Sequence, residues 1–140
     1  MNGKRIINVN AYNEHKWRIE GAQHQHTEDG GSVNSGDSFK KEINVTAHYK
    51  MVTINITLTG NSGIPLATSD IMVTISGPSE TLFTDSYSLG NNDVETIQFS
   101  VNEGETIGKW TLLLDSENQE FEPGDFSYDY EWYNYYPTSS

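Results

Sequence analysis

The acidic loops carry the side chains whose type and spacing best suit chemistry, and that chemistry is cation binding. The stretch DSENQEFEPGD places Asp115, Glu117 and Asp125 close together between two strand-like segments. Calcium takes about six to eight oxygen ligands, and such a loop offers carboxylates and backbone carbonyls together. The spacing does not follow that of an EF-hand. The sequence therefore predicts either a calcium site among these acids or plain solvated turns.

Histidines form a second metal-binding pattern. The stretch QHQH at residues 23–26 places His24 and His26 on one face of an extended segment, because alternate residues of a strand point the same way. Two imidazoles there could share a metal ion, with a third ligand from His15, His48 or Glu28. The alternative is a polar strand end that enters a loop.

Catalytic motifs are absent from the sequence. The chain has no G-x-S-x-G, P-loop, H-E-x-x-H or G-x-G-x-x-G pattern. It also has no cysteine, which excludes disulfides, thiolate metal sites and a cysteine nucleophile. We therefore expect that this protein is not an enzyme.

The most aromatic stretch, DFSYDYEWYNYY at residues 125–136, divides into two faces if it forms a strand. The two faces are Phe126, Tyr128, Tyr130 and Trp132 on one side, and Ser127, Asp129, Glu131 and Tyr133 on the other. Because the second face is polar and acidic, the first is predicted to be core. The residues predicted to contact a ligand or partner are Tyr133, Tyr135, Tyr136, Asp129, Glu131 and Trp17.

These residues require a sheet scaffold, and the sequence indicates one. A period of two runs through most of the chain, which predicts roughly eight to ten short strands and no substantial helix. We predict one domain, residues 1–140, with an all-β fold: a two-sheet antiparallel β-sandwich of jelly-roll type, with a β-barrel as the weaker alternative. The Gly/Ser-rich residues 24–38 are predicted to be a flexible polar loop.

The predicted strands follow from this alternation. They are Lys4–Tyr12, Lys16–Gln23, Phe39–Ala47, Lys50–Gly60, Ile71–Gly77, Ser79–Leu89, Val94–Val101, Lys109–Asp115 and the aromatic stretch. Two of them contain N-glycosylation sequons, at Asn44 and Asn55, which matter only if the chain is exported. Asn55 should face away from the core, since Ile54 and Ile56 face inward.

The charge is strongly acidic and unevenly distributed. The net charge is -12, of which residues 1–50 contribute +1 and residues 51–140 contribute -13. Such a field repels nucleic acid and anionic membranes, and it suits calcium, cationic partners or docking of the N-terminal part onto a neighbouring copy. No apolar run approaches the length of about 20 residues that a membrane span requires. No signal peptide is visible, so the chain is either cytosolic or lacks a leader or anchor that a precursor carries.

From Val45 onward, a series of motifs resembles a known family. The motifs are INITLTG, SD at Asp70, MVTISGPSE, ETIQFSV, GKWTLLLD and a Gly-Asp loop before the tyrosine-rich strand. This order, over Val45–Tyr136, resembles the pre-peptidase C-terminal and P-domain-like jelly-roll modules of secreted bacterial and archaeal proteins. The resemblance implies an exported jelly-roll β-sandwich without a catalytic centre. Such modules often bind calcium at a loop acid, and Asp70 is the matching position.

Two functions from different classes remain open. The first is a non-catalytic structural or interaction module, outside the cell or at its surface, that associates with copies of itself or a surface assembly such as a filament. Residues 1–23 would then be a docking segment or a strand added to a neighbour's sheet. The second is a carbohydrate-binding module appended to a secreted enzyme, which the acidic and aromatic-rich sequence also suits.

Overall fold

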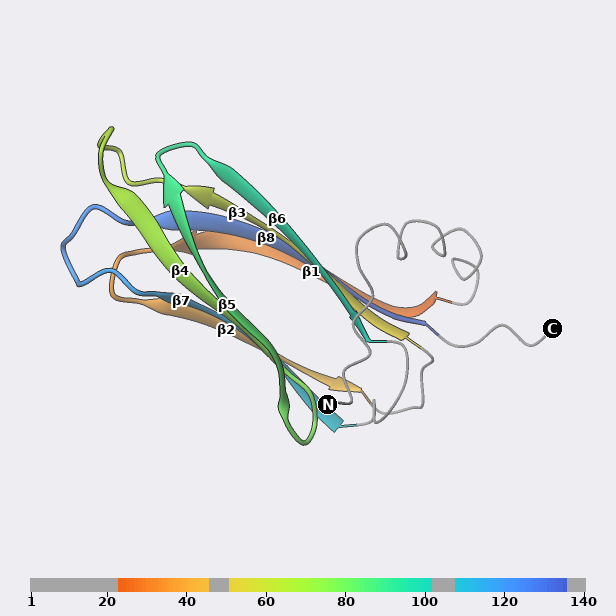
Figure 1. Cartoon of the computed structure of the whole chain (residues 1–140). Coiled ribbons are helices and arrows are strands. Elements are labelled where there is room, and N and C mark those ends of the chain that lie inside the picture. Colours follow the sequence, from red (N-terminus) through yellow and green to blue (C-terminus); the bar gives the residue numbers. More distant parts are fainter. Residues whose placement is uncertain (1–22, 46–50, 102–107, 136–140) are drawn as a thin grey trace.

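The computed structural model of the chain describes residues 23–45, 51–101 and 108–135, and it is all-β (Figure 1). The strands are β1 (Gln23–Val33), β2 (Ser38–Val45), β3 (Met51–Gly60), β4 (Thr68–Ser76), β5 (Thr81–Gly90), β6 (Val94–Val101), β7 (Gly108–Ser116) and β8 (Phe126–Tyr135). None of the described residues is in a helix, so this part of the chain holds no helix that could cross a membrane.

The strands form two four-stranded sheets that pack face to face (Figure 1). One sheet has the order β1-β8-β3-β6 and the other the order β2-β7-β4-β5. The pairs are nested in the sequence, β1 with β8, β2 with β7, β3 with β6 and β4 with β5, and all are antiparallel. A long hairpin rolled into two layers gives this nesting, which is the topology of a jelly roll. The predicted fold class is confirmed.

The core lies between the sheets, as the alternation of apolar and polar residues along the strands predicted. The apolar side chains of β3 and the aromatic face of β8 are buried, and they include Ile54, Ile56, Leu58, Phe126, Tyr128, Tyr130 and Trp132. Trp110 of β7 meets Trp132 edge to face, with ring centroids 5.8 Å apart and an interplanar angle of 82°. This pair joins one sheet to the other across the middle of the sandwich. The predicted core face of the aromatic stretch is confirmed.

The prediction that residues 24–38 form a flexible loop is wrong. Most of that segment belongs to β1, and the connection to β2 covers only residues 34–37. β1 pairs with β8 from Gln23 to Val33, so its backbone groups are satisfied by a strand about 100 residues further along the chain. The polar composition of β1 reflects its position at the sheet edge, where few of its side chains reach the core.

Two glycines that suggested a loop instead permit close packing against β8. A Cβ atom at Gly31 would lie 2.9 Å from the hydroxyl oxygen of Tyr128. A Cβ atom at Gly30 would overlap the carboxylate of Asp129. Glycine in a strand often marks such a close approach. The predicted strands Lys4–Tyr12 and Lys16–Gln23, and the docking segment 1–23, lie outside the described residues except for Gln23 itself.

Candidate functional site

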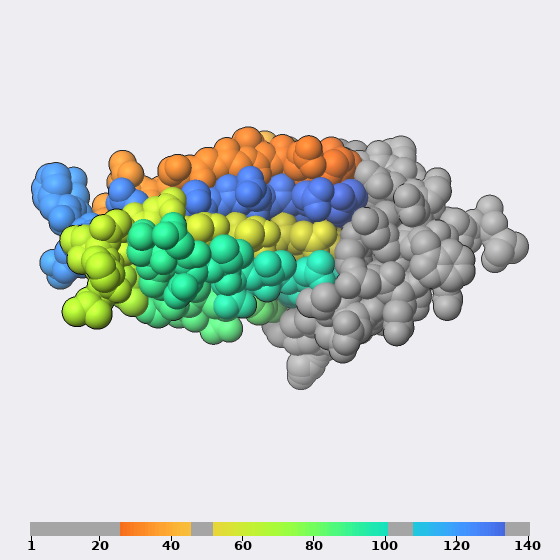
Figure 2. Space-filling view, turned by 90° about the horizontal axis from the view of Figure 1, so that it is seen from above, coloured from red at the N-terminus to blue at the C-terminus, as the bar shows by residue number. Residues whose placement is uncertain are grey.

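The outer face of the β1-β8-β3-β6 sheet gathers the polar side chains of four strands. Figure 2 looks down on this face, where β1 (orange), β8 (blue), β3 (yellow) and β6 (teal) lie side by side. One row across the sheet runs from Glu28 through Glu131 and Asn55 to Gln98, each residue directly opposite the next. Alternation makes this row polar because its sequence neighbours, such as Trp132 and Ile54, face the core.

A groove of about 420 Å³ is hollowed into this face. Its lining residues are Glu28, Asp29, Asn55, Thr57, Asp129, Tyr130 and Glu131. Four of the seven are carboxylic acids, Asn55 supplies an amide and Thr57 a hydroxyl group, whereas the ring of Tyr130 is buried in the core. Gly30 lies directly opposite Asp129, so no side chain from β1 fills the space beside that carboxylate. The groove therefore owes part of its shape to a glycine in the edge strand.

A compact group of side chains closes one end of the groove. The imidazole of His26 stacks on the ring of Tyr133, with centroids 4.4 Å apart and an interplanar angle of 7°. The Tyr133 hydroxyl donates a hydrogen bond of 3.0 Å to Oε2 of Glu131. His26 Nε2 lies 3.4 Å from Glu28 Oε1 and 4.0 Å from Glu131 Oε2. Among the described residues, His26, Glu28 and Glu131 are the one set of three metal-ligating side chains that come together.

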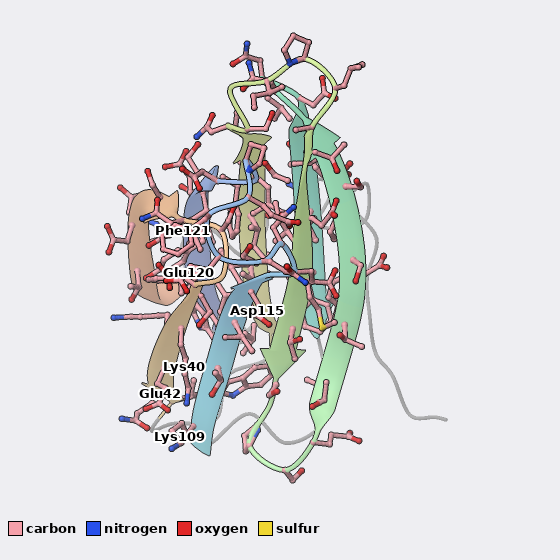
Figure 3. The ribbon with its side chains drawn as sticks, turned by 90° about the vertical axis from the view of Figure 1, so that its left-hand side faces the viewer. Lys40, Glu42, Lys109, Asp115, Glu120 and Phe121 are labelled. Atoms are coloured by element: carbon pink, nitrogen blue, oxygen red, sulfur yellow. The ribbon has the colours of Figure 1, made fainter. Side chains whose placement is uncertain are left out.

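The groove is lined mostly by acids, and the lysines of the described residues lie elsewhere. These are Lys40, Lys41 and Lys109, all on the other sheet, in β2 and β7. Figure 3 shows Lys40 and Lys109 beside Glu42, whose carboxylate they approach to 3.3 and 3.6 Å. The hydrogen bond from Lys40 and the charge of Lys109 lower the pKa of Glu42. The groove acids have no such partner among the described lysines.

Tyrosines beneath the groove are held in their neutral form. Burial, and then the charge of Asp29, raise the pKa of Tyr128 and of Tyr130. Both phenols therefore stay protonated at neutral pH.

The predicted contact residues divide into three groups. Asp129, Glu131 and Tyr133 lie on this outer face, and Tyr133 is half-buried against His26 rather than freely exposed. Tyr135 ends β8, and its side chain lies outside the described part of the structure. Trp17 and Tyr136 also lie outside the described residues.

The alternation that predicted a pairing of His24 with His26 is interrupted in the structure. β1 has a register shift between Gln23 and Gln25, so the alternation that placed His24 beside His26 does not run through this segment. The side chain of His24 is not described. His26 does approach Glu28, one of the third ligands considered from the sequence alongside His15 and His48, but Glu131 joins them from β8. Only the pairing of β1 with β8 could reveal that third member.

The acids predicted to bind calcium are distributed around the opposite loop end, and several already serve as hydrogen-bond acceptors. Asp70 Oδ1 accepts hydrogen bonds from Thr68 and Ser88, at 2.9 and 2.7 Å. Asp125 Oδ1 accepts one from the backbone N–H of Ser35 at 3.0 Å.

The backbone N–H of Glu117 donates to the carbonyl of Asp70, while Asp115 lies within β7. Among the described residues these four acids do not come together as a set of three carboxylate ligands. Calcium binding at Asp70, Asp115, Glu117 or Asp125 stays a prediction.

The two sequon asparagines occupy very different environments. Asn44 is exposed near the end of the edge strand β2. Asn55 faces away from the core, as expected, but it lies in the central strand β3 with its Oδ1 atom buried and without a hydrogen-bond partner. The same holds for Oε1 of Gln98, directly opposite. Glycosylation at both positions stays a prediction.

A second surface feature lies at the loop end of the sandwich. Leu66 is 96% exposed and Phe121 is 94% exposed, and Ile64 is half-exposed beside them in the sequence of the β3–β4 loop. Phe121 projects from the β7–β8 loop next to Glu120 (Figure 3), and its backbone has a φ of 73°, which side-chain-bearing residues seldom adopt. Large apolar side chains exposed together often mark an interaction surface.

Comparisons with known proteins show little likeness in sequence. No protein-family model matches the chain, and no curated protein sequence is significantly similar to it. One similar solved structure is a carbohydrate-binding module from Cellvibrio mixtus lichenase 5A in complex with cellotriose, at 12% identity and a TM-score of 0.38 over 84% of this chain and 90% of that one.

Another is a family GH115 4-O-methyl-alpha-glucuronidase with specificity for decorated arabinogalactans, at 10% identity and a TM-score of 0.40 over 99% of this chain and 18% of that one. Both similarities are too low to transfer a function. The β-sandwich implied by the resemblance to pre-peptidase C-terminal modules is observed, and membership of that family stays a prediction.

Proposed function

We propose that this chain is a non-catalytic carbohydrate-binding module that holds its ligand in the groove on the outer face of the β1-β8-β3-β6 sheet. The observation that carries the proposal is the groove itself, about 420 Å³ in volume and lined by carboxylates, an amide and a hydroxyl group. Binding sites for small ligands have volumes of about 300–1,000 Å³. A rigid sheet positions these groups better than a loop would.

The lining chemistry suits a polyhydroxylated ligand. An ionised carboxylate accepts hydrogen bonds through both oxygens, and hydrogen bonds to charged groups are stronger than neutral ones. Asp129 and Glu131 lie two residues apart on β8, on the same face, and Asn55 lies opposite Glu131 on β3. Adjacent hydroxyl groups of a sugar ring would therefore find several acceptors, and the Asn55 amide would add a donor.

The acidic residues of the groove limit the kinds of sugar that are expected to bind. The outward-facing carboxylates of Glu28, Asp129 and Glu131 have no nearby described lysine and repel uronic acids and sulfated sugars. The expected ligands are therefore neutral sugars or sugars with an amino group, and anionic polysaccharides such as pectin or heparin should not bind.

Calorimetric titration with cello-, xylo- and chito-oligosaccharides tests the proposal. Calorimetry does not depend on tryptophan fluorescence, and the two tryptophans of the described residues, Trp110 and Trp132, are both fully buried. The test variants are Asp129→Asn and Asn55→Ala. Since a hydrogen bond to a charged group contributes about 1.5–3 kcal/mol and a neutral one about 0.5–1.5 kcal/mol, we expect Asp129→Asn to lose about tenfold or more in affinity and Asn55→Ala to lose less.

A matched control removes a charge away from the groove. Glu80 is exposed in the connection between β4 and β5, so Glu80→Gln should bind sugar as the parent does. The proposal would be wrong if no neutral or amino sugar bound at millimolar concentration, or if Asp129→Asn and Asn55→Ala bound as tightly as the parent.

A second candidate function, a protein-interaction module, rests on the apolar loop end. Leu66 and Phe121 are almost fully exposed, and a second groove of about 560 Å³ lies beside Phe121 and Ile64. Association through this end, with copies of the chain or with a surface assembly, would cover these side chains. Analytical ultracentrifugation of the parent and of Leu66→Ser/Phe121→Ser tests it: the parent should associate and the double variant should not. A parent that stays monomeric at high concentration would exclude self-association.

Both candidate functions place the chain outside the cell or at its surface, where polysaccharides and surface assemblies occur. Calcium at the loop acids and strand addition by residues 1–23 remain part of this proposal rather than findings. Fractionation of the native source, followed by immunodetection of the chain, tests the location. A chain found only in the cytosol would contradict it.

A further inference from the structure

We propose that His26, Glu28 and Glu131 bind a divalent transition-metal ion, represented by Zn²⁺, at the end of the groove on the outer sheet face. The three side chains come from two paired strands, and their ligand atoms all lie within 4.8 Å of one another. One imidazole nitrogen and two carboxylate oxygens are ligands that zinc accepts. The imidazole makes calcium and magnesium poor occupants, because both prefer oxygen ligands.

The distances fit a single ion with little movement. Two ligand atoms about 2.1 Å from one ion in a tetrahedral arrangement lie about 3.4 Å apart. His26 Nε2 and Glu28 Oε1 are already 3.4 Å apart, and Glu131 Oε2 is 4.0 Å from the same nitrogen. Since all three ligand atoms lie within 4.8 Å of one another, shifts of at most about 1.4 Å in the accessible glutamate side chains complete a three-ligand site.

Electrostatics gives an independent reason to expect a cation here. Glu28 and Glu131 lie directly opposite each other on neighbouring strands, and like charges in this position destabilise a sheet. The lysines of the described residues are all on the other sheet, so none compensates this pair. A bound divalent cation would neutralise both carboxylates at once.

Tyr133 holds two of the ligands in position. Its ring stacks on His26 at an interplanar angle of 7°, and its hydroxyl donates a hydrogen bond to Glu131 Oε2. Such supporting contacts commonly orient metal ligands. Tyr133 is thus a positioning residue rather than a ligand. All three ligands remain accessible, with 34%, 64% and 44% of the His26, Glu28 and Glu131 side chains exposed, so an ion can enter from solvent.

Titration of the full chain with Zn²⁺ by calorimetry, without any sugar present, tests this site. We expect saturable binding that His26→Gln and Glu28→Gln each weaken at least tenfold. Equal concentrations of Ca²⁺ or Mg²⁺ should not compete. In a parallel NMR titration, Ni²⁺ should broaden the resonances of His26, Glu28 and Tyr133 before those of the loop acids.

The matched control is Glu120→Gln, which removes an exposed charge at the opposite loop end and should leave Zn²⁺ affinity unchanged. Circular dichroism establishes that each variant is folded. Zinc affinity of His26→Gln within twofold of the parent, or first broadening elsewhere, would overturn the site. Because Asp129→Asn and Asn55→Ala alter sugar binding without removing a metal ligand, failure of the carbohydrate proposal and failure of the metal site are separate results.

Discussion

At the scale of single residues, Tyr87 makes the stability of the folded protein depend on pH in the alkaline range. Burial, followed by the charges of Asp85 and Glu95 and a hydrogen bond to Asp85, raises the pKa of Tyr87 from 10.0 to about 12. The folded protein therefore holds the phenolic proton more tightly than the unfolded chain does. The resulting stabilisation is complete below about pH 10 and is lost as the pH rises through about 12.

This shift predicts a specific effect of Tyr87→Phe. The parent should lose thermal stability between pH 10 and 12, and the variant, which has no proton to lose, should lose less. Because the pKa values of Tyr128 and Tyr130 are also raised, part of the loss should persist in the variant. Melting temperatures measured at several values from pH 9 to 12 check this. Identical slopes for parent and variant would contradict the role of Tyr87.

Another residue-scale prediction concerns the contact between the two sheets. Trp132 is fully buried and meets Trp110 edge to face across the sandwich. Trp132→Ala should lower the free energy of unfolding by about 3–5 kcal/mol, since it removes a large buried side chain and leaves a cavity. Denaturant titration measures the change, and Trp132→Phe should cost less because it keeps an aromatic ring. A loss below about 1 kcal/mol for Trp132→Ala would show that the site collapses around the missing ring.

At the scale of elements, the end of β3 is tied to the turn between β5 and β6. The backbone N–H of Gly60 donates to the carbonyl of Asp93, and its carbonyl accepts from Asn92. A Cβ atom at Gly60 would overlap the carbonyl oxygen of Gly90 and lie 2.9 Å from that of Leu89. Both obstacles are backbone atoms, so neither can rotate away.

Gly60→Ala should therefore destabilise the fold by about 1–3 kcal/mol, the usual cost of forcing an extra group into a packed site. Chemical unfolding of the variant measures this. Gly63→Ala is an informative comparison: nothing lies within 4 Å of a Cβ there, and only its positive φ of 76° opposes the change. The close-packing explanation fails if Gly60→Ala is as stable as the parent.

The strands differ in how well their own local sequence predicts that they are strands. The alternation of Ile54, Ile56 and Leu58, and of the aromatic face of β8, predicted both the strands and their buried sides, because each has one apolar face. β1 lacks that signal. Its strand form depends on pairing with β8, and no local pattern reports a partner about 100 residues away.

The candidate site, too, could be predicted from the sequence only in part. Asp129, Glu131 and Tyr133 were foreseen as outward-facing residues because one strand's alternation determines them. The set of His26, Glu28 and Glu131 could not be foreseen in full, since it needs the register between β1 and β8. The groove, too, depends on Gly30 lying opposite Asp129, which the sequence showed only as a loop-like glycine.

At the scale of the whole molecule, the charge distribution predicts how stability depends on salt. The net charge is -12, and the described lysines gather on β2 and β7, leaving the groove face and the loop end acidic. Such an imbalance destabilises the compact state by self-repulsion. Raising the ionic strength from 0.01 to 0.15 M shortens the Debye length from about 30 to about 8 Å and screens that repulsion.

The melting temperature should therefore rise with NaCl over this range, by about 4 °C if screening contributes about 1 kcal/mol. The variant Glu28→Gln/Asp129→Asn removes two groove charges and should show a smaller rise than the parent, because less repulsion remains to be screened. Sucrose at matched osmolality serves as the uncharged control and should not distinguish the two proteins. If NaCl instead lowered the melting temperature of the parent, ion pairs such as Lys40 and Lys109 with Glu42 would outweigh the repulsion among the acids.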